Sequence, residues 1–318
     1  MKIGVIPDIH GCTGWKNNIN KLNDCQKIIF LGDYVDSFNA EEKGLPALKN
    51  CKDIIKFKDD NPDRVDLLVG NHEFENYWFY YGKCSGFQYA CYESYHNFFV
   101  EHAACFKIAV EYEGWVFSHA GISKVWLDNL KTGLKYRIPD FEFPENDLDL
   151  INDLLVTKNV SSFSFYENDW SGCGNNVAQG PLWIRPEALI ESHAYDKQVV
   201  GHTELRIANE YAALEQNGLK LLLVDTPSHS TYYILDTENP PEFKSPMESA
   251  REQKKAEKEA LNKRAVNGQR RKDLMIKYNI TKNELLAIES KFEDKTSETY
   301  WDDVEKEIKL LCSITGSA

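Results

Sequence analysis

Acidic, amide and imidazole side chains occur in five small clusters, each directly after a short apolar run. The clusters are Asp8-Ile9-His10-Gly11, Gly32-Asp33-Tyr34-Val35-Asp36, Gly70-Asn71-His72-Glu73, His119-Ala120-Gly121 and Gly201-His202-Thr203. Carboxylates, amides and imidazoles bind divalent metal ions in proteins. Together the clusters offer more ligands than the roughly four that one zinc ion takes. They suit two adjacent divalent ions that share a carboxylate, so the sequence predicts a dinuclear metal centre.

The apolar runs before the clusters are rich in Val, Ile, Leu and Phe, which is typical of buried strands. They are Lys2–Ile6, Lys27–Leu31, Val65–Val69, Trp115–Ser118 and Gln198–Val200. Ligand sites in α/β sheets gather at the carboxyl ends of strands, so these ends would bring the clusters together. Each cluster alone has an ordinary interpretation, since Gly-Asn is a common turn dipeptide and a lone histidine is usually structural. The five in this order favour the metal site.

The series Asp-x-His-Gly, Gly-Asp-x-x-Asp, Gly-Asn-His-Glu, His-Ala-Gly and Gly-His-Thr resembles the calcineurin-like metallophosphoesterases, above all their bacterial and phage Ser/Thr-type phosphatases. The resemblance covers about residues 1–235. It implies an α/β fold, an αββα sandwich of two mixed β-sheets flanked by helices. It also implies two metal ions, Mn²⁺ or an Fe/Zn-type pair. The implied ligands are Asp8, His10 and Asp33 for the first ion, and the bridging Asp33 with Asn71, His119 and His202 for the second.

The resemblance further implies that His72 is a general acid and that Asp36 orients it. Elementary chemistry supports these roles, because a phosphate ester is an anion that repels nucleophiles. Two metal ions polarise the phosphoryl oxygens and lower the pKa of a bridging water, so that a hydroxide can attack in line. Negative charge then develops on the leaving oxygen, where an imidazolium can donate a proton. A carboxylate behind that imidazole fixes its orientation and favours its charged form.

Two positions concern the binding of the substrate phosphate. Ser/Thr phosphatases carry an arginine directly after the second Asp of Gly-Asp-x-x-Asp, and here that position is Ser37. A hydroxyl cannot make the charged bidentate contact of a guanidinium. Arg185, within Leu-Trp-Ile-Arg, resembles the Leu-Trp-x-Arg segment of bacterial members and is the alternative phosphate-binding residue, unless it is a surface side chain before Pro186. The missing arginine moves the expected substrate away from phosphoproteins.

Two further segments bear on the substrate. The stretch 77–99 holds eleven aromatic residues, and Gly82 and Gly86 should divide it into two helical pieces. These rings form either a packed layer beside the site or a wall on which a nucleobase stacks. The long insertion 128–180 contains acidic residues that would disfavour polyanionic substrates, and such insertions often form lids.

Composition divides the chain. Its 318 residues are 42% hydrophobic and carry 37 Lys+Arg against 50 Asp+Glu, a net charge of −13 that argues against a surface built for nucleic acid or anionic membranes. From residue 244 onward, however, basic residues number 16 against 14 acidic ones. Prolines at 240, 241 and 246 indicate a linker. We therefore predict a catalytic domain at 1–240 and a helical C-terminal extension at 245–318, with helices at 247–272, 282–294 and 298–312 and breaks at Gly268 and Asn279.

The remaining expectations concern location and partners. No apolar run reaches the roughly 18 residues of a membrane span. The eight cysteines are scattered, and the N-terminal apolar stretch is short for a secretory signal, so we expect a cytoplasmic protein with reduced thiols. The basic cluster at 263–272 could contact RNA or an acidic partner, but a helix with internal ion pairs, packed on the domain or on a second copy, explains it as well. The oligomeric state stays open.

The leading hypothesis is a metal-dependent phosphoesterase, a hydrolase acting on a phosphomonoester of a protein, a nucleotide or a small molecule, with Mn²⁺ as the expected ion. The first alternative is a phosphodiesterase or dinucleotide hydrolase that uses the aromatic segment for base stacking. The second is a non-catalytic module in which the metal centre is structural and the extension recruits a partner. All ligand-type residues are present, which favours an enzyme.

Overall fold

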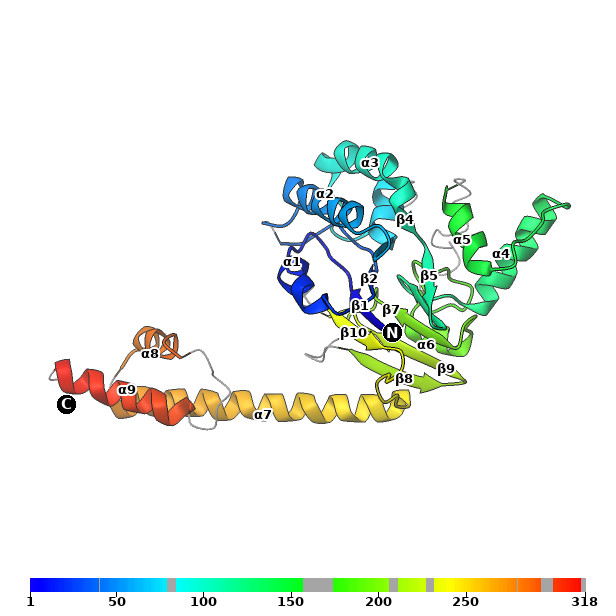
Figure 1. Cartoon of the computed structure of the whole chain (residues 1–318). Helices are drawn as coiled ribbons and strands as arrows, with labels where there is room; N and C mark the ends of the chain where they lie inside the picture. The colour runs from blue at the N-terminus through cyan, green and yellow to red at the C-terminus, as the bar shows by residue number, and fades with distance from the viewer. Residues whose placement is uncertain are drawn as a thin grey trace. The chain divides into compact units, whose positions relative to one another are not determined.

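The structure is a computed structural model that describes residues 1–39, 41–78, 84–156, 174–205, 211–226, 232–278, 280–292 and 300–315. The chain divides into two compact units, Met1–Ser249 and Ala250–Ala318 (Figure 1). The division falls inside helix α7 (Pro246–Tyr278), so the predicted linker near residue 240 lies just before that helix.

Two five-stranded sheets form the centre of the first unit. In spatial order, the first contains β10 (Tyr233–Asp236), β1 (Lys2–Ile6), β2 (Lys27–Phe30), β3 (Val65–Leu68) and β4 (Phe106–Lys107). The second contains β5 (Ala109–Tyr112), β6 (Trp115–Ser118), β7 (Lys197–Val200), β9 (Leu219–Leu223) and β8 (Ala212–Gln216). Both are mixed, because β10, β5 and β8 run antiparallel to neighbours that otherwise pair in parallel. All five predicted strands are confirmed to within one residue.

The core explains why the strands stand out in the sequence. Around β2, Ile28 and Phe30 pack into the outer helical layer, whereas Ile29 and Leu31 pack between the two sheets. All four side chains are fully buried. Because both faces of such parallel strands are covered, their sequences are continuous apolar runs instead of alternating ones.

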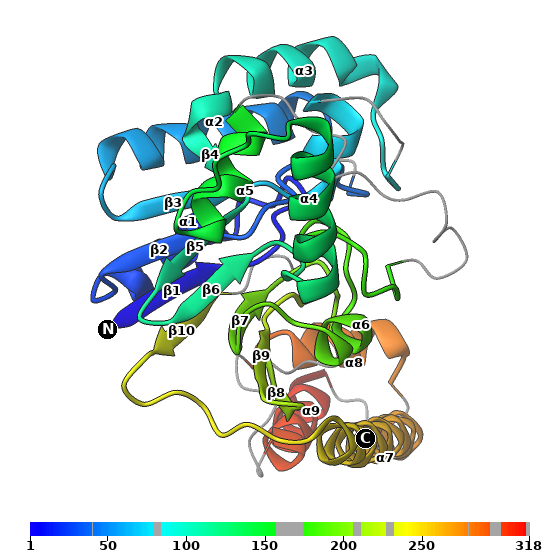
Figure 2. The ribbon, with the colours of Figure 1, turned by 90° about the vertical axis from the view of Figure 1, so that its right-hand side faces the viewer.

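Helices cover both outer faces (Figure 2). The first sheet is covered by α1 (Trp15–Asn18), α2 (Leu45–Asp60) and α3 (Tyr92–Glu101), and the second by α4 (Lys124–Arg137), α5 (Asp147–Val156) and α6 (Pro186–Glu191). The predicted αββα sandwich of two mixed sheets is therefore confirmed. The serine-rich part of the predicted insertion, 157–173, lies outside the described residues.

The aromatic segment is part of the core. A π-helical turn at His72–Trp78 precedes α3, and residues 79–83, including the predicted break at Gly82, lie outside the described ones. Tyr77 and Tyr95 meet edge to face with ring centroids 4.7 Å apart, and both are fully buried. Phe99 is buried as well, while Tyr92 is half-buried on the same helix. Of the two alternatives that the sequence left open, the described rings therefore form the packed layer.

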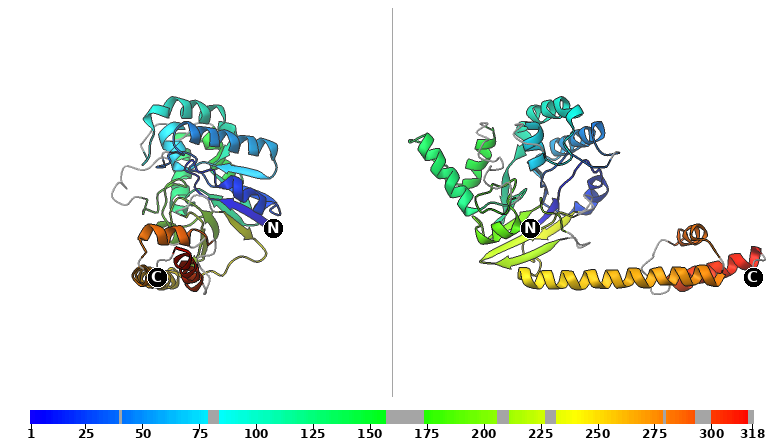
Figure 3. Two further views of the ribbon diagram at one scale, coloured as in Figure 1. Left: turned by 90° about the vertical axis from the view of Figure 1, so that its left-hand side faces the viewer. Right: turned by 180° about the vertical axis from the view of Figure 1, so that it is seen from behind.

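The second unit is helical. It contains most of α7, α8 (Lys282–Glu289) and α9 (Tyr300–Thr315), joined by a small core that includes Leu274, Ile288 and Val304. Figure 3 shows α7 as one continuous helix, so the predicted break at Gly268 is wrong. A glycine inside a helix costs only about 1 kcal/mol, and the surrounding residues are good helix formers. Asn279 lies outside the described residues.

Ion pairs hold the end of α7 to the other two helices. The Arg271 guanidinium donates to both oxygens of the buried Glu289 carboxylate at 2.7 and 2.6 Å, and Lys277 lies 2.7 Å from Glu305. Part of the predicted basic cluster is thus engaged within the extension. Within the described ranges, no helix has both the length and the apolar composition needed to cross a membrane.

Candidate active site

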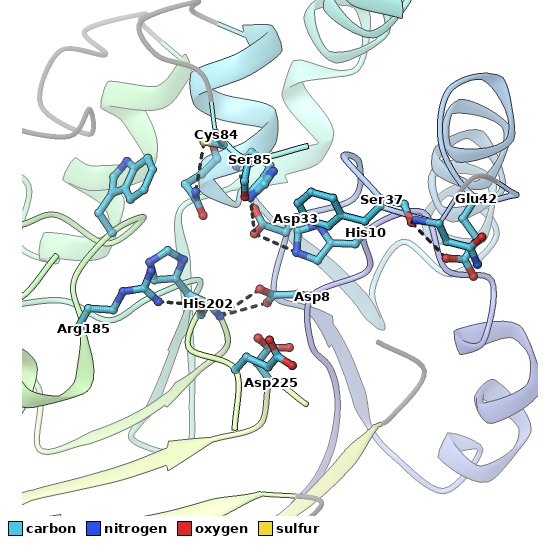
Figure 4. A pocket seen from close by; sticks show the side chains of 16 residues that line it. Asp8, His10, Asp33, Ser37, Glu42, Cys84, Ser85, Arg185, His202 and Asp225 are labelled. Atoms are coloured by element: carbon cyan, nitrogen blue, oxygen red, sulfur yellow. Dashed lines mark hydrogen bonds and ion pairs between the residues drawn. The ribbon is translucent and has the colours of Figure 1, made fainter. Parts of the chain in front are cut away.

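The carboxyl ends of β1, β2, β3, β6 and β7 meet beside one cavity of about 430 Å³ (Figure 4). Eight of the ten residues singled out in the sequence line it: Asp8, His10, Asp33, Ser37, Asn71, His72, Arg185 and His202. Asp36 does not line the cavity but contacts His72. The tenth, His119, is fully buried behind the wall. The five clusters therefore converge, as the strand-end argument predicts.

The backbone at the strand ends is unusual. His10, Asp33, Asp36 and His202 all have positive φ angles, from 42° to 67°. Residues other than glycine seldom adopt this left-handed region, and such strain concentrates at functional sites. Here the turns at His10, Asp33 and His202 place those side chains at the cavity, and the turn at Asp36 places its carboxylate against His72. A neighbouring glycine leaves room for the Asp8 side chain: a Cβ at Gly201 would lie 2.3 Å from the Asp8 carboxylate, which would then have to move.

Asp33 lies at the centre of the site. Two groups of three residues each bring their potential ligand atoms within 4.8 Å of one another. One group is His10, Asp33 and His72, and the other is Asp33, His119 and His202. Asp33 is common to both, which is the position of a bridging carboxylate. Burial alone would raise its pKa, but His119, His72 and His10 together hold the pKa of Asp33 well below its ordinary value. It is therefore an anion.

Three ligand-type atoms crowd together on one side of Asp33. His119 Nε2 lies 2.9 Å from Asn71 Oδ1 and 3.2 Å from His202 Nδ1. The other ring nitrogen of His119 lies 3.0 Å from the Leu31 carbonyl oxygen, so a neutral His119 places its proton there and directs a lone pair from Nε2 at the amide oxygen. Two lone pairs at this distance repel unless a cation lies between them.

His202 is a second imidazole whose surroundings favour a bound cation. Burial, with Arg185 and His119 nearby, holds the pKa of His202 well below its ordinary value, so the ring is neutral and can serve as a ligand. Its Nε2 is buried and has no hydrogen-bond partner within the described parts of the chain. Its backbone N–H donates to both Asp8 oxygens at 3.2 Å, which fixes the Asp8 carboxylate beside it.

On the other side of Asp33, His10 and His72 face it. Their Nε2 atoms lie 3.7 and 3.9 Å from Asp33 Oδ2. His10 Nδ1 lies 3.0 Å from the Val35 carbonyl oxygen, so its Nε2 is the nitrogen that faces the cavity. Oxygen and imidazole donors of this kind bind divalent ions, and such ions would relieve the repulsion between the crowded ligand atoms. The residues therefore fit the two-ion centre that the sequence predicts.

His72 has a second, separate interaction. Its Nδ1 lies 3.0 Å from Asp36 Oδ2, and Asp36 also accepts hydrogen bonds from Asn76 and Tyr77. Asp36 is fully buried. Burial by itself would lower the pKa of His72, but the charge of Asp33 and the hydrogen bond to Asp36 raise the pKa of His72 to about 9. The imidazole is thereby kept protonated at neutral pH, as a proton donor must be.

Ser37 and Arg185 line opposite sides of the cavity (Figure 4). The Ser37 hydroxyl donates to Glu42 Oε2 at 3.2 Å and accepts from the Asn39 N–H, so it serves the turn in which it lies. Arg185 is half-buried and donates to His202 O at 2.9 Å and to Thr203 Oγ1 at 3.1 Å. Arg185 is therefore not an exposed surface side chain before Pro186, which was the alternative left open by the sequence.

The sequence analysis assigned no role to two acidic residues at the site. Glu73 is fully buried, and its carboxylate accepts the backbone N–H groups of Gly70, Asp33 and Tyr34, which holds two of the clusters together. Burial, then Asp33, raises the pKa of Glu73 to about 8. Asp225 is also buried and lines the cavity after β9. The sequence shows the same pattern at Asp225, because this acidic residue also directly follows an apolar run.

The chain is similar to one protein family and to several solved structures. A family model described as calcineurin-like phosphoesterase matches residues 1–222. Among solved structures, a protein serine/threonine phosphatase from Saccharomyces cerevisiae is 19% identical, with 72% of this chain and 68% of that chain covered and a TM-score of 0.43. A cold-active protein tyrosine phosphatase is 17% identical, with 74% of each chain covered and a TM-score of 0.43.

A metallophosphoesterase from Sphaerobacter thermophilus is 13% identical, with 77% of this chain and 90% of that chain covered and a TM-score of 0.37. No curated protein gives a significant match. The family model alone spans more than half of the chain, and it contains all five clusters that meet at the cavity. The chain therefore belongs to the calcineurin-like phosphoesterases, whose chemistry is the metal-dependent hydrolysis of phosphate esters.

Proposed function

We propose that the protein hydrolyses a phosphomonoester with two divalent ions, Mn²⁺ being the expected pair. The first ion is held by Asp8, His10 and Asp33, and the second by Asp33 with Asn71, His119 and His202. When bound, the ions supply the positive charge that lets a nucleophile approach a phosphate ester, and they activate water. The observation that carries the proposal is the position of His72, between the shared ligand Asp33 and the buried Asp36.

In this proposal His72 protonates the leaving oxygen. Asp36 holds the ring by its Nδ1, which leaves the Nε2 proton directed toward the cavity. Asn76 and Tyr77 in turn fix Asp36, so the donor is positioned before substrate arrives.

Arg185 is the proposed contact for the substrate phosphate. Its Nη1 is anchored by the turn at His202 and Thr203, which holds the charged guanidinium at the wall of the cavity. Ser37 contributes less, because its hydroxyl is engaged with Glu42.

The diester alternative loses the support that it drew from the aromatic segment. The base-stacking alternative relied on the segment 77–99, and none of its described aromatic residues lines the cavity. Aromatic side chains reach the cavity from elsewhere, at Phe38 and Trp183. The natural substrate, the metal pair in the cell and a cytoplasmic location stay predictions.

The test is hydrolysis of an aryl phosphate monoester by the purified full chain with Mn²⁺, alongside a matched diester. We expect faster turnover of the monoester. Asp33→Asn should abolish hydrolysis and His72→Asn should lower kcat about 10²–10⁴-fold. His102→Asn, the same change at a histidine outside the cavity, should do neither. Full activity of His72→Asn would refute the acid role, and bound metal without turnover on a broad panel would favour the non-catalytic module.

A further inference from the structure

Asp225 is a buried acidic side chain that accepts a hydrogen bond from the backbone N–H of Thr226 but has one oxygen without a partner in the described parts of the chain. It stands two residues after β9, and its side chain is only 3% exposed. The oxygen without a partner is Oδ1, which is itself buried. A carboxylate removed from water without a partner is strongly destabilising, so buried charges are normally paired or bound to metal ions.

The backbone holds Asp225 firmly at this place. The N–H of the preceding Val224 donates to Val200 O at 3.0 Å, and Asp225 O accepts from Leu205 N at 3.0 Å. These bonds tie it to both sides of the turn that carries His202. Asp225 therefore stands at a sixth strand end, one strand beyond those that supply the predicted ligands.

The groups that face Asp225 are largely acidic. It lines the same cavity as Asp8, Asp33 and Glu204, and Figure 4 shows its side chain beside that of Asp8. The carboxylates of Asp8, Asp33 and Glu204 all repel a negative charge on Asp225. Arg185, the arginine of the cavity wall, is engaged with His202 and Thr203, and His72 is hydrogen-bonded to Asp36. Among the described residues, then, no basic side chain pairs with Asp225.

We propose that Asp225 belongs to the metal centre, where its carboxylate completes the acidic surroundings of the ion held by Asp8 and His10. The proposal rests on the two-ion centre of the proposed function. It explains why four carboxylates converge on one cavity wall in which they repel one another. Divalent cations nearby attract each carboxylate and so offset that repulsion. Groups around the direct ligands of a metal site commonly change metal affinity by 10- to 100-fold.

A structural role makes a different prediction. If Asp225 were only a protonated acid that fills space, replacing it with the isosteric asparagine would leave metal affinity unchanged. If its charge serves the ion, the asparagine variant removes a repulsive charge from the metal-free protein and an attractive one from the loaded protein. The metal-free variant is then as stable as the wild type or more so, and metal stabilises it less.

The experiment is a calorimetric titration of the metal-free full chain with Mn²⁺, together with thermal unfolding with and without Mn²⁺. Variants are Asp225→Asn, Asp225→Ser as a second neutral form, Asp225→Glu to restore the charge, and Asp66→Asn as a control at a buried aspartate outside the cavity. We expect one of two dissociation constants to rise 10- to 100-fold in the neutral variants, with partial recovery in Asp225→Glu.

The outcomes separate the two proposals. Two ions in the wild type with unchanged affinities in both neutral variants would overturn the role of Asp225 and leave the metal centre intact. A lower melting temperature of metal-free Asp225→Asn, with an unchanged shift on adding Mn²⁺, would also overturn it. Fewer than two ions bound by the wild type would instead contradict the proposed function itself.

Discussion

His72 Nδ1 lies 3.0 Å from Asp36 Oδ2, and the two residues come from the ends of neighbouring strands, β3 and β2. Asp33 and Asp36 both raise the pKa of the imidazole, so this contact is one of two that favour the protonated form of His72. The contact also fixes which ring nitrogen faces the cavity. Two predictions follow from this pair of residues.

The first concerns pH. The pKa of His72 is raised to about 9 by Asp33 and Asp36 against the opposing effect of burial. A proton donor is active below its pKa, so activity should fall as pH rises through that value. Asp36→Asn removes one of the raising charges, and the alkaline limb of the kcat profile should move to lower pH. An unmoved limb would show that Asp36 does not control the donor.

The second separates two roles of His72. Its Nε2 lies near Asp33, so a ligand role would also be compatible with the distances. As a general acid, His72→Asn should lose about 10²–10⁴-fold in kcat while still binding two metal ions. Metal content by mass spectrometry gives the answer. Loss of one ion together with activity would make His72 a ligand.

Arg185 should act on substrate binding. Charge-assisted hydrogen bonds contribute about 1.5–3 kcal/mol each, so Arg185→Ala should raise KM by about tenfold or more. The substitution also loosens the turn at His202, and Thr203→Val tests that effect alone, because it removes one anchoring bond and keeps the guanidinium. Equal KM increases in both variants would contradict a direct phosphate contact.

Acid stability should depend on Asp66 of β3, away from the cavity. Burial raises its pKa, but hydrogen bonds from Tyr112 and Lys107 at 2.5 and 2.9 Å outweigh this and hold the pKa of Asp66 below its ordinary value. Its stabilising effect is therefore complete above pH of about 4 and lost as pH falls through the folded-state pKa.

Urea unfolding of Asp66→Asn and wild type at several pH values measures this effect. The difference in unfolding free energy should be about 1–3 kcal/mol at neutral pH and shrink in acid. Asp128→Asn, which removes an exposed ion pair with Lys124, should change stability far less. A difference independent of pH would contradict the ionised state of Asp66.

The helical extension should be dispensable for the chemistry. Every described residue that lines the cavity lies at or before Asp225, and the last strand of the first unit, β10, ends at Asp236. A chain ending at Ser245 should therefore keep the kcat and KM of the full chain on a small aryl phosphate. A large loss of kcat in a folded truncated protein would place the extension within the catalytic unit.

Much of the fold and site was predictable because they share one signal. Buried parallel strands are continuous apolar runs, and each run here ends in a turn that carries proposed ligands, so strands and clusters identify each other. The same signal at Val224-Asp225 was overlooked because one acidic residue after a run carries little weight alone. Glu73 could not be assigned from sequence, since its partners are backbone N–H groups that only the fold brings to it.

Other features depended on distant packing. The segment 77–99 could have faced the cavity or the core, and only the contact between the π-helical turn and α3 decides this. Gly268 indicated a helix end, but a glycine with open space around it is tolerated when its neighbours favour the helix. The place of Arg185 depends on the turn at His202, which lies on another strand end.

The most direct measurement is anomalous X-ray scattering from crystals of the full chain grown with Mn²⁺. The account predicts two peaks in the cavity, one against Asp8 and His10 and the other against Asn71, His119 and His202, with Asp33 in contact with both. A single peak, or two peaks that do not share Asp33, would contradict it.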